Sequence, residues 1–257
     1  KLLFDAGKDW KSLTTFSPMR NKPKFPKVPK EKSSTIQLKG YAGLNISTRY
    51  RLLSAFSNLR YNNHYYVYLN PTFIIDKNQT KYYYEGNFQP QYNKESFSGL
   101  GFENDWVVLQ IGKGNESWGA GTVQLALSES SNLYNYFLIG SDYGKIRVRY
   151  IHGFLETVSK NNNRFITARG FEWTNKKSLV IGFSETVIYS GEGRILDIGY
   201  LNPISSHLEI ELNNRLNQIG SIGSNGVWQI HFDFLLANSI RFSLNYLFDE
   251  FVLDKNI

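Results

Sequence analysis

The residues with the greatest capacity for chemistry lie in a glycine-rich stretch, GKGNESWGAG, which begins at Gly112. It holds Glu116 and Trp118 among four glycines, and glycine permits positive φ angles and close approach of the backbone. Aromatic faces pack on the C–H faces of sugars, while carboxylates and amides bind hydroxyl groups. The stretch could therefore bind a carbohydrate; alternatively, Trp118 fills the wall of a barrel.

Carboxylates elsewhere could supply a pair for cleavage of a glycosidic bond. The candidates lie on separate predicted strands, so their spacing selects no pair: Glu116, Glu129, Glu156, Glu172 and Glu185. The sequence has no G-x-S-x-G motif, no phosphate loop and no His-x-x-His cluster. We therefore predict no catalysis, no metal site and no cofactor, and keep a carbohydrate-active enzyme with a Glu/Asp pair as an alternative.

The elements that must position these side chains are strands. Val107, Leu109 and Ile111 alternate with polar or smaller residues, and we expect a second strand over 123–128 after the glycines. Long alternating segments follow at 145–151, 178–189, 227–236 and 239–248. An earlier segment, 52–59, has apolar spacing that also fits a helix.

These alternating segments predict an all-β fold, an antiparallel transmembrane β-barrel. Several reach roughly nine to ten residues, where soluble strands average about five or six, and each has one apolar face and one polar face. We expect the apolar face to meet lipid. The polar face then lines the lumen, where opposite charges pair across strands: Arg147, Arg149, Asp233, Arg241 and Asp249. A soluble barrel or sandwich is the alternative.

Composition agrees with strands and polar loops. Aromatic residues make up 16% of the 257 residues, and there is no cysteine. The net charge of +7 would suit nucleic acid, an anionic polysaccharide or lipid headgroups, but no nucleic-acid motif is present, so we expect no such partner. Residues 1–34 form an N-terminal segment with a basic, proline-rich loop, either a linker or an anion-binding arm, and residues 35–257 form the barrel.

Five short motifs, in order, resemble the Wzi family of capsule-assembly proteins of the outer membrane. The family has a strand, a W-G-x-G turn and a small-residue strand that ends in serine. The matching segments are Trp118-Gly119-Ala120-Gly121, Tyr150–Leu155, GFSETVIYSGEGR from Gly182, Tyr200-Leu201-Asn202-Pro203 and Asp249-Glu250-Phe251. The resemblance covers residues 100–255 well and residues 35–100 loosely.

This resemblance implies a barrel of about 18 strands in the outer membrane of a Gram-negative bacterium. Such a protein anchors or assembles capsular or exopolysaccharide without catalysis, as a lectin-like monomer in contact with outer-membrane lipid. A general porin is the alternative. No signal peptide or N-terminal helical part is visible, so we expect a chain that is incomplete at both ends.

Two sets of candidate residues follow. The first is expected to bind polysaccharide or to form a network inside the barrel: Glu116, Trp118, Arg147, Arg149, Glu185, Tyr189, Arg194, Asn202, Asp249 and Glu250. Within it, we expect the four residues Glu185, Asn202, Asp249 and Glu250 to be buried with arginine partners. The second set has a structural role: Gly119, Gly121, Pro203 and Phe251.

Overall fold

A computed structural model describes residues 36–46, 51–62, 64–75, 97–121, 124–128, 131–159, 162–207, 209–210, 224–236 and 240–249. The predicted basic loop within residues 1–34 lies outside these ranges. So do Glu250 and Phe251 of the last motif.

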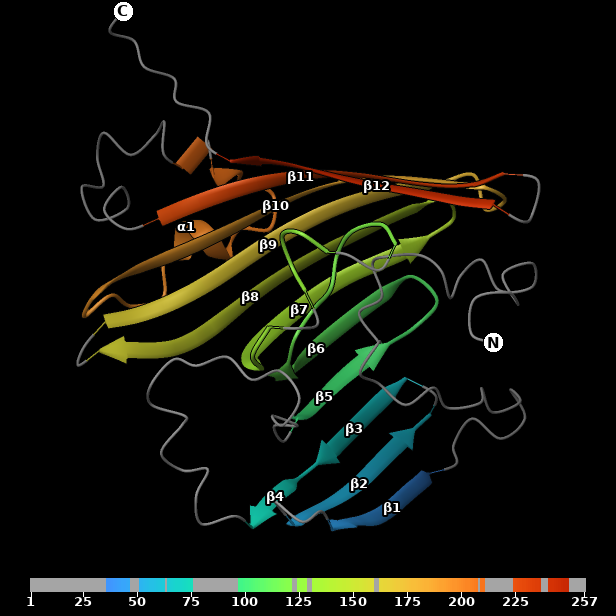
Figure 1. Ribbon diagram of the computed structural model, residues 1–257, viewed down its shortest axis with the longest axis vertical. Coiled ribbons are helices and arrows are strands. Elements are labelled where there is room, and N and C mark those ends of the chain that lie inside the picture. The colour runs from blue at the N-terminus through green and yellow to red at the C-terminus, as the bar shows by residue number, and fades with distance from the viewer. Residues whose placement is uncertain are drawn as a thin grey trace, which may run out of the picture.

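Every strand described belongs to one sheet of twelve strands, and all neighbours in it are antiparallel (Figure 1). The first six are β1 (Gln37–Ile46), β2 (Arg51–Tyr61), β3 (Tyr65–Asn70), β4 (Thr72–Ile75), β5 (Phe97–Glu103) and β6 (Val107–Gly114). The others are β7 (Tyr134–Tyr143), β8 (Ile146–Ser159), β9 (Asn162–Thr174), β10 (Leu179–Glu192), β11 (Ser224–Leu236) and β12 (Ile240–Asp249). One short helix, α1 (Ile198–Leu201), precedes β11.

The sheet is a meander in which sequence neighbours are spatial neighbours. Strands β3 and β4 both pair with β2, and Pro71 separates them without shifting the register. Pro71 has no N–H to give to the ladder, although its carbonyl accepts a hydrogen bond from the backbone N of Ala55 at 3.1 Å. The all-β, antiparallel prediction is confirmed. Among the described strands, β1 and β12 are the two edges, and no ladder joins them.

The connections differ between the two ends of the sheet. At one end, called here the short-turn end, the strands are joined by residues 62–64, 104–106, 144–145, 175–178 and 237–239. At the opposite, long-connection end, three links are much longer: 76–96, 115–133 and 193–223. The two other links at that end, 47–50 and 160–161, are short.

Two local predictions were wrong. Segment 52–59 lies within strand β2, because pairing with β1 on one side and β3 and β4 on the other overrides its helical spacing. The expected strand over 123–128 is reduced, in its described part, to one isolated bridge between Trp118 and Leu127. Gly119 and Gly121 have φ angles of +133° and +72°, which interrupt an extended path after β6.

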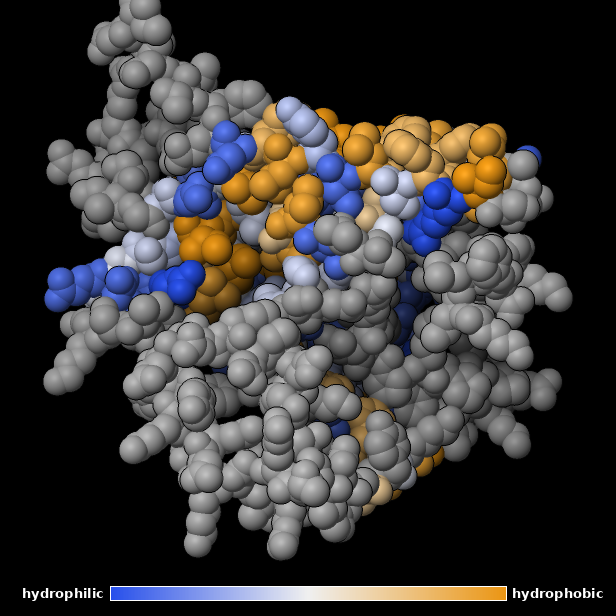
Figure 2. Space-filling view, viewed as in Figure 1, coloured by the Kyte–Doolittle hydropathy of each residue, from blue (hydrophilic) through white to orange (hydrophobic). Residues whose placement is uncertain are grey.

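The two faces of the sheet have opposite character. One face, called the outer face, exposes large apolar side chains on successive strands: Val67, Leu100, Ile111, Val148, Phe171, Phe183, Ile230 and Phe242. The other, inner face buries an apolar cluster together with many polar side chains: Gln110, Arg149, Glu172, Gln229, His231 and Asp233. Figure 2 shows apolar surface gathered along the upper part of the molecule, where Figure 1 places β11 and β12.

The sheet curls around its inner face. Trp118 belongs to a buried cluster that includes Tyr136 of β7, Ile151 of β8 and Ala168 of β9. Its carbonyl also accepts a hydrogen bond from Gln229 Nε2 of β11, at 3.2 Å. In a flat sheet, β7 and β11 would be about 19 Å apart, four steps of ~4.8 Å. One residue can reach both only because the strands bend toward each other.

Glycines make room for large inner side chains on neighbouring strands. Gly182 of β10 pairs with His231 of β11, and a Cβ atom at Gly182 would overlap the imidazole ring. Gly140 of β7 pairs with Arg149 of β8, whose Cδ would lie 2.6 Å from such a Cβ. These side chains therefore lie flat over the adjacent backbone.

We predict that Gly182→Ala destabilises the protein by about 1–3 kcal/mol, the usual cost of overpacking a filled site. The measurement is the midpoint of urea unfolding. The same substitution in a His231→Ala background should cost much less, because the overlapping ring is gone. An equal cost in both backgrounds would show that the close approach of the imidazole is not the cause.

Candidate functional site

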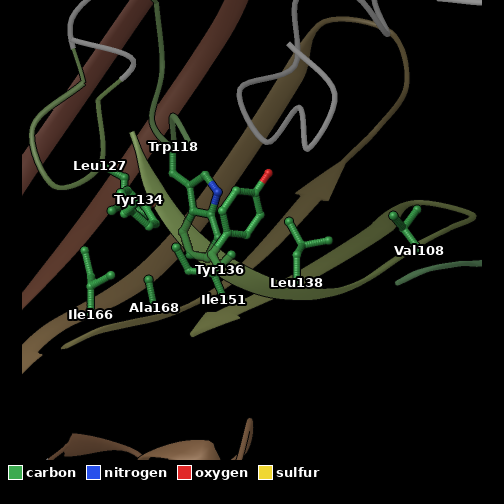
Figure 3. Packing of buried hydrophobic residues seen from close by; sticks show 9 residues of the cluster. All are labelled: Val108, Trp118, Leu127, Tyr134, Tyr136, Leu138, Ile151, Ile166 and Ala168. Carbon is green, nitrogen blue, oxygen red and sulfur yellow. The ribbon is translucent and has the colours of Figure 1, made fainter. Parts of the chain in front are cut away.

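The inner face carries the candidate site, and a loop from β6 crosses it. This crossing loop comprises residues 115–128, of which 122 and 123 lie outside the described residues. It buries Glu116, Trp118 and Ala120 almost completely. Figure 3 shows the Trp118 indole lying beside Tyr134, Tyr136 and Ile151, so that its ring packs on the middle of the sheet.

Two amides on β11 and β12 hold the crossing loop from the far side. Gln229 donates to the carbonyl of Trp118 at 3.2 Å and accepts from the backbone N of Ala126 at 3.1 Å. Asn245 accepts from the backbone N of Ala120 at 2.6 Å and donates to its carbonyl at 2.8 Å. The loop, which begins at the end of β6, is therefore attached to the last two strands of the sheet.

The glycines of the W-G-A-G motif permit this attachment. A Cβ atom at Gly119 would lie 2.8 Å from Asn245 Oδ1 and 2.9 Å from Gln229 Nε2. At Gly121 it would lie 3.0 Å from Ser243 Cβ, and the positive φ angle adds strain for any other residue. The loop backbone reaches the two strands because these positions lack side chains.

A buried chain of hydroxyl and amide groups leads away from Glu116. Tyr136 donates to Glu116 Oε1 at 3.1 Å and accepts from Gln110 Nε2 at 2.5 Å. Gln110 also donates to the hydroxyl of Tyr68 at 3.0 Å and accepts from that of Tyr66 at 3.0 Å. The chain links β3, β6 and β7 to the crossing loop.

Charged side chains form a second chain across β7, β8, β9 and β11, in which Glu172 and His231 are buried and Asp142 is exposed. Arg147 pairs with Asp142 at 3.0 Å and with Glu172 at 3.2 Å, and Glu172 also contacts His231 Nε2 at 3.0 Å. The predicted pairing of opposite charges on this face is confirmed here. Pairing is necessary because an isolated buried charge is costly.

Two further inner arginines are bound in different ways, one by an ion pair and one by backbone carbonyls. The guanidinium of Arg241 on β12 forms an ion pair with Asp233 on β11, with Nε 2.7 Å from Oδ1. Arg149 donates from Nη1 to the carbonyls of Ser141 and Val148, at 3.0 and 2.9 Å. Arg149 is buried, so the arrangement supports a network within the protein more than contact with an external ligand.

Glu185 does have an arginine partner, but it lies on the other side of the sheet. Its Oε2 is 3.2 Å from Arg169 Nε, and its Oε1 accepts from Trp228 Nε1 at 2.9 Å and from the backbone N of His207 at 3.0 Å. Glu185 is in register with Arg169 and Trp228 on the outer face. It therefore does not join Glu116 and Glu172 in one site.

Tyr189 and Arg194 lie on the outer-face side with Glu185. Tyr189 is fully buried and stacks on Tyr200, with ring centroids 4.5 Å apart. The guanidinium of Arg194 lies 4.7 Å from the centroid of the Tyr189 ring and donates to the carbonyl of Ser190 at 3.1 Å. Tyr189 is thus part of a core rather than a ring exposed to sugar.

Asn202, Pro203 and Asp249 are exposed, so the expected buried network of Glu185, Asn202 and Asp249 is wrong. Asn202 instead holds its own turn, accepting from the backbone N of Ile204 at 3.1 Å and donating to Ser205 Oγ at 2.7 Å. Asp249 closes β12 in register with Val227. Short motifs at strand ends did not indicate which face a residue occupies.

Sequence reasoning missed several residues that organise the inner face: Gln110, Gln229, His231 and Asn245. The sequence signal that could have identified them was their polar character at inward-facing positions of alternating strands. Among the described residues, no group of three or more His, Asp or Glu side chains is arranged to hold a metal ion. In the same part of the chain, no helix has the length and apolar character to span a membrane.

Comparisons with protein-family models, with curated proteins and with solved structures found no match for the chain.

We predict that Gln229→Ala and Asn245→Ala loosen the crossing loop. Each leaves backbone groups buried without partners, at about 1–3 kcal/mol per group, and about 1.4 kcal/mol is a tenfold change in an opening equilibrium. Cleavage after Glu116 by a glutamyl endopeptidase should accelerate roughly tenfold or more. The control is Asn225→Ala, an exposed asparagine on β11. Equal cleavage rates in all variants would contradict the prediction.

Proposed function

We propose that this chain forms part of an outer-membrane β-barrel that holds capsular or exopolysaccharide without catalysis. The observation that carries the proposal is the distribution of side chains: large apolar residues are exposed on the outer face, and the inner face buries charged residues beside the apolar cluster of Trp118. Proteins in water show the reverse, since they bury apolar side chains and expose charges. A barrel in lipid has an apolar outer band and a polar interior.

The extent of exposed apolar surface supports a lipid environment. Ile111 is 59% exposed, Leu100 56% and Phe242 57%, and the three residues lie on different strands. Soluble monomers rarely expose contiguous apolar patches larger than a few hundred Å². Here such residues occur on strand after strand from β1 to β12. A single protein partner would have to cover the whole outer face, whereas lipid covers it without special complementarity.

The difference between the two ends also supports this proposal. Outer-membrane barrels have short turns on the periplasmic side and long loops outside, and here all three long connections, 76–96, 115–133 and 193–223, lie at one end. Aromatic side chains are exposed near the short-turn end, as in an interfacial girdle: Tyr61, Tyr65, Trp106 and Tyr143. The long-connection end would then face the exterior, where surface polysaccharide lies.

Amide and guanidinium groups occur on two strands near the long-connection end. Asn135 is exposed at the start of β7, and Asn162, Asn163 and Arg164 are half-buried at the start of β9. Amides both donate to and accept from sugar hydroxyls, and guanidinium groups bind carboxylates of acidic sugars. The resemblance to the Wzi family implies the same class of ligand, a surface polysaccharide.

Two alternatives have less support. A general porin shares the outer face, but the crossing loop lies over the inner face, where a porin has an open channel. A glycosidase needs two carboxyl groups about 5–10 Å apart around one bond. Glu185 lies on the outer face, away from Glu116 and Glu172, and Glu172 already binds Arg147 and His231.

We predict that Phe183→Arg destabilises the protein in lipid by about 2–4 kcal/mol, the cost of a cation on the lipid face of a barrel. On a surface in water, the same change would cost within about 0.5 kcal/mol. The measurement is urea unfolding of protein folded into liposomes, with Phe183→Leu as the control. Unfolded and folded wild-type protein should also migrate differently on an unheated gel. A wild-type protein that stays in buffer without detergent would refute the membrane proposal.

We predict that Asn135→Ala, Asn162→Ala and Arg164→Ala together weaken binding to purified capsular polysaccharide by at least about tenfold, or 1.4 kcal/mol. The matched control is Lys145→Ala with Lys176→Ala and Lys177→Ala, which removes more positive charge at the short-turn end. An equal loss in both variants would indicate only charge attraction. Absence of wild-type binding would favour a porin. Release of reducing ends that is lost in Glu185→Gln would establish an enzyme.

A further inference from the structure

The outer face of β8–β11 changes character along the strands. One row across them is apolar: Val148, Phe171, Phe183 and Ile230, in register. The next row, two residues closer to the long-connection end, is polar and charged: Tyr150, Arg169, Glu185 and Trp228. On a lipid-facing surface, charges at this level would be unfavourable by a few kcal/mol.

The apolar rows alone are too short for a membrane. On β11 the outward apolar residues run from Ile230 to Leu236, three steps of two residues. At ~3.4 Å per residue this is about 20 Å along the strand. A tilt of about 40° reduces it to roughly 15 Å, where barrels have an apolar band about 25 Å tall. Roughly 10 Å of apolar surface is missing at this place.

A segment between β10 and β11 covers the charged row. This outer strap comprises residues 194–207 and includes α1, which Figure 1 shows beside β9 and β10. The carbonyl of Tyr200 accepts from the hydroxyl of Tyr150 at 2.8 Å and from Thr167 Oγ1 at 3.5 Å. The ring of Tyr200 stacks on Tyr189, and its hydroxyl lies 3.1 Å from His207 Nδ1.

The strap also donates a backbone hydrogen bond to Glu185. The backbone N of His207 donates to Glu185 Oε1 at 3.0 Å, beside the Arg169 ion pair. Gly226 of β11 makes room for the His207 ring, because a Cβ atom there would overlap it. Together, these contacts place the strap over the charges and fix it to four strands, β8 to β11.

The opposite side of the strap exposes three large aliphatic side chains, in addition to Asn202 and Pro203. Ile195 is 79% exposed, Ile198 81% and Ile204 88%. These are aliphatic side chains, and protein–protein hot spots are instead enriched in Trp, Tyr and Arg. They lie beyond the exposed row of Phe171, Phe183 and Ile230, so the outer apolar surface continues onto the strap.

We propose that the outer strap completes the lipid-facing band of the barrel. Its isoleucines lie among acyl chains, while its inward side seals the Arg169–Glu185 pair and the neighbouring hydroxyl groups from lipid. This inference rests on the proposed membrane location and adds one specific lipid-contacting segment to it. The strap provides apolar surface where the strands themselves turn polar.

Single cysteines test this proposal cleanly, because the chain contains no cysteine. Ile198→Cys, Phe183→Cys and Lys176→Cys are each spin-labelled in the full chain and folded into phosphatidylcholine liposomes. Collision rates with oxygen, which concentrates in lipid, and with a water-soluble nickel chelate are compared. We expect Ile198 and Phe183 to have several-fold higher oxygen-to-nickel ratios than Lys176, which lies in a turn at the short-turn end.

The outcomes separate the two proposals. A lipid signature at Phe183 with a water signature at Ile198 would overturn the strap inference and leave the membrane location intact. Water signatures at both would overturn the membrane location itself. Protection of Ile198 from both reagents would mean that protein covers the strap, which also overturns the inference. Ile195→Cys and Ile204→Cys repeat the test if Ile198→Cys does not fold, as judged by migration on an unheated gel.

Discussion

The structure depends on keeping the buried charges of the curled sheet paired. Curling withdraws the inner face from water, and each buried ion there needs a partner within the protein. Arg147, Glu172 and His231 meet this need together, as do Asp233 and Arg241. Removing one member of such a pair typically costs about 3–5 kcal/mol. The register of the strands that carry them is therefore fixed by charge as well as by backbone hydrogen bonds.

The crossing loop extends this constraint from neighbouring strands to distant ones. Ladder hydrogen bonds join each strand only to the next and cannot set how far the whole sheet bends. Gln229 and Asn245 bind the loop backbone directly, and the loop also carries Trp118 into the cluster on β7, β8 and β9. A change in the curvature of the sheet would break these hydrogen bonds or pull the indole out of its packing. The loop therefore fixes the curvature of the sheet.

Alternation in the sequence was sufficient to predict the strands and the pairing of inner charges. The predictions for β8, β10, β11 and β12 held because a period of two over seven or more residues favours a strand. The prediction for 123–128 failed although its residues alternate, because a strand also needs a neighbour to pair with. Within the described part of that segment, 124–128, only Leu127 pairs, with Trp118.

The candidate site was less predictable than the fold. Glu185 and Glu172 are both buried acids on adjacent strands, each with an arginine partner. In the β9–β10 ladder, Glu185 pairs with Arg169, which is an odd number of residues from Glu172, so the two acids point to opposite faces. This relation becomes evident only once the two strands have been aligned. The long-range bonds of Asn245 to Ala120 join residues far apart in the chain, and no local pattern encodes them.

The described parts of the connections 115–133 and 193–223 lie against the sheet, one over each face. The crossing loop packs Trp118 on apolar side chains of the inner face and binds Gln229 and Asn245 through its backbone, and the outer strap covers Arg169 and Glu185 with Tyr200 and His207. Each connection thus separates strand residues of its face from the surroundings. Two loops that begin at the same end of the sheet thus decide what each face presents to its surroundings.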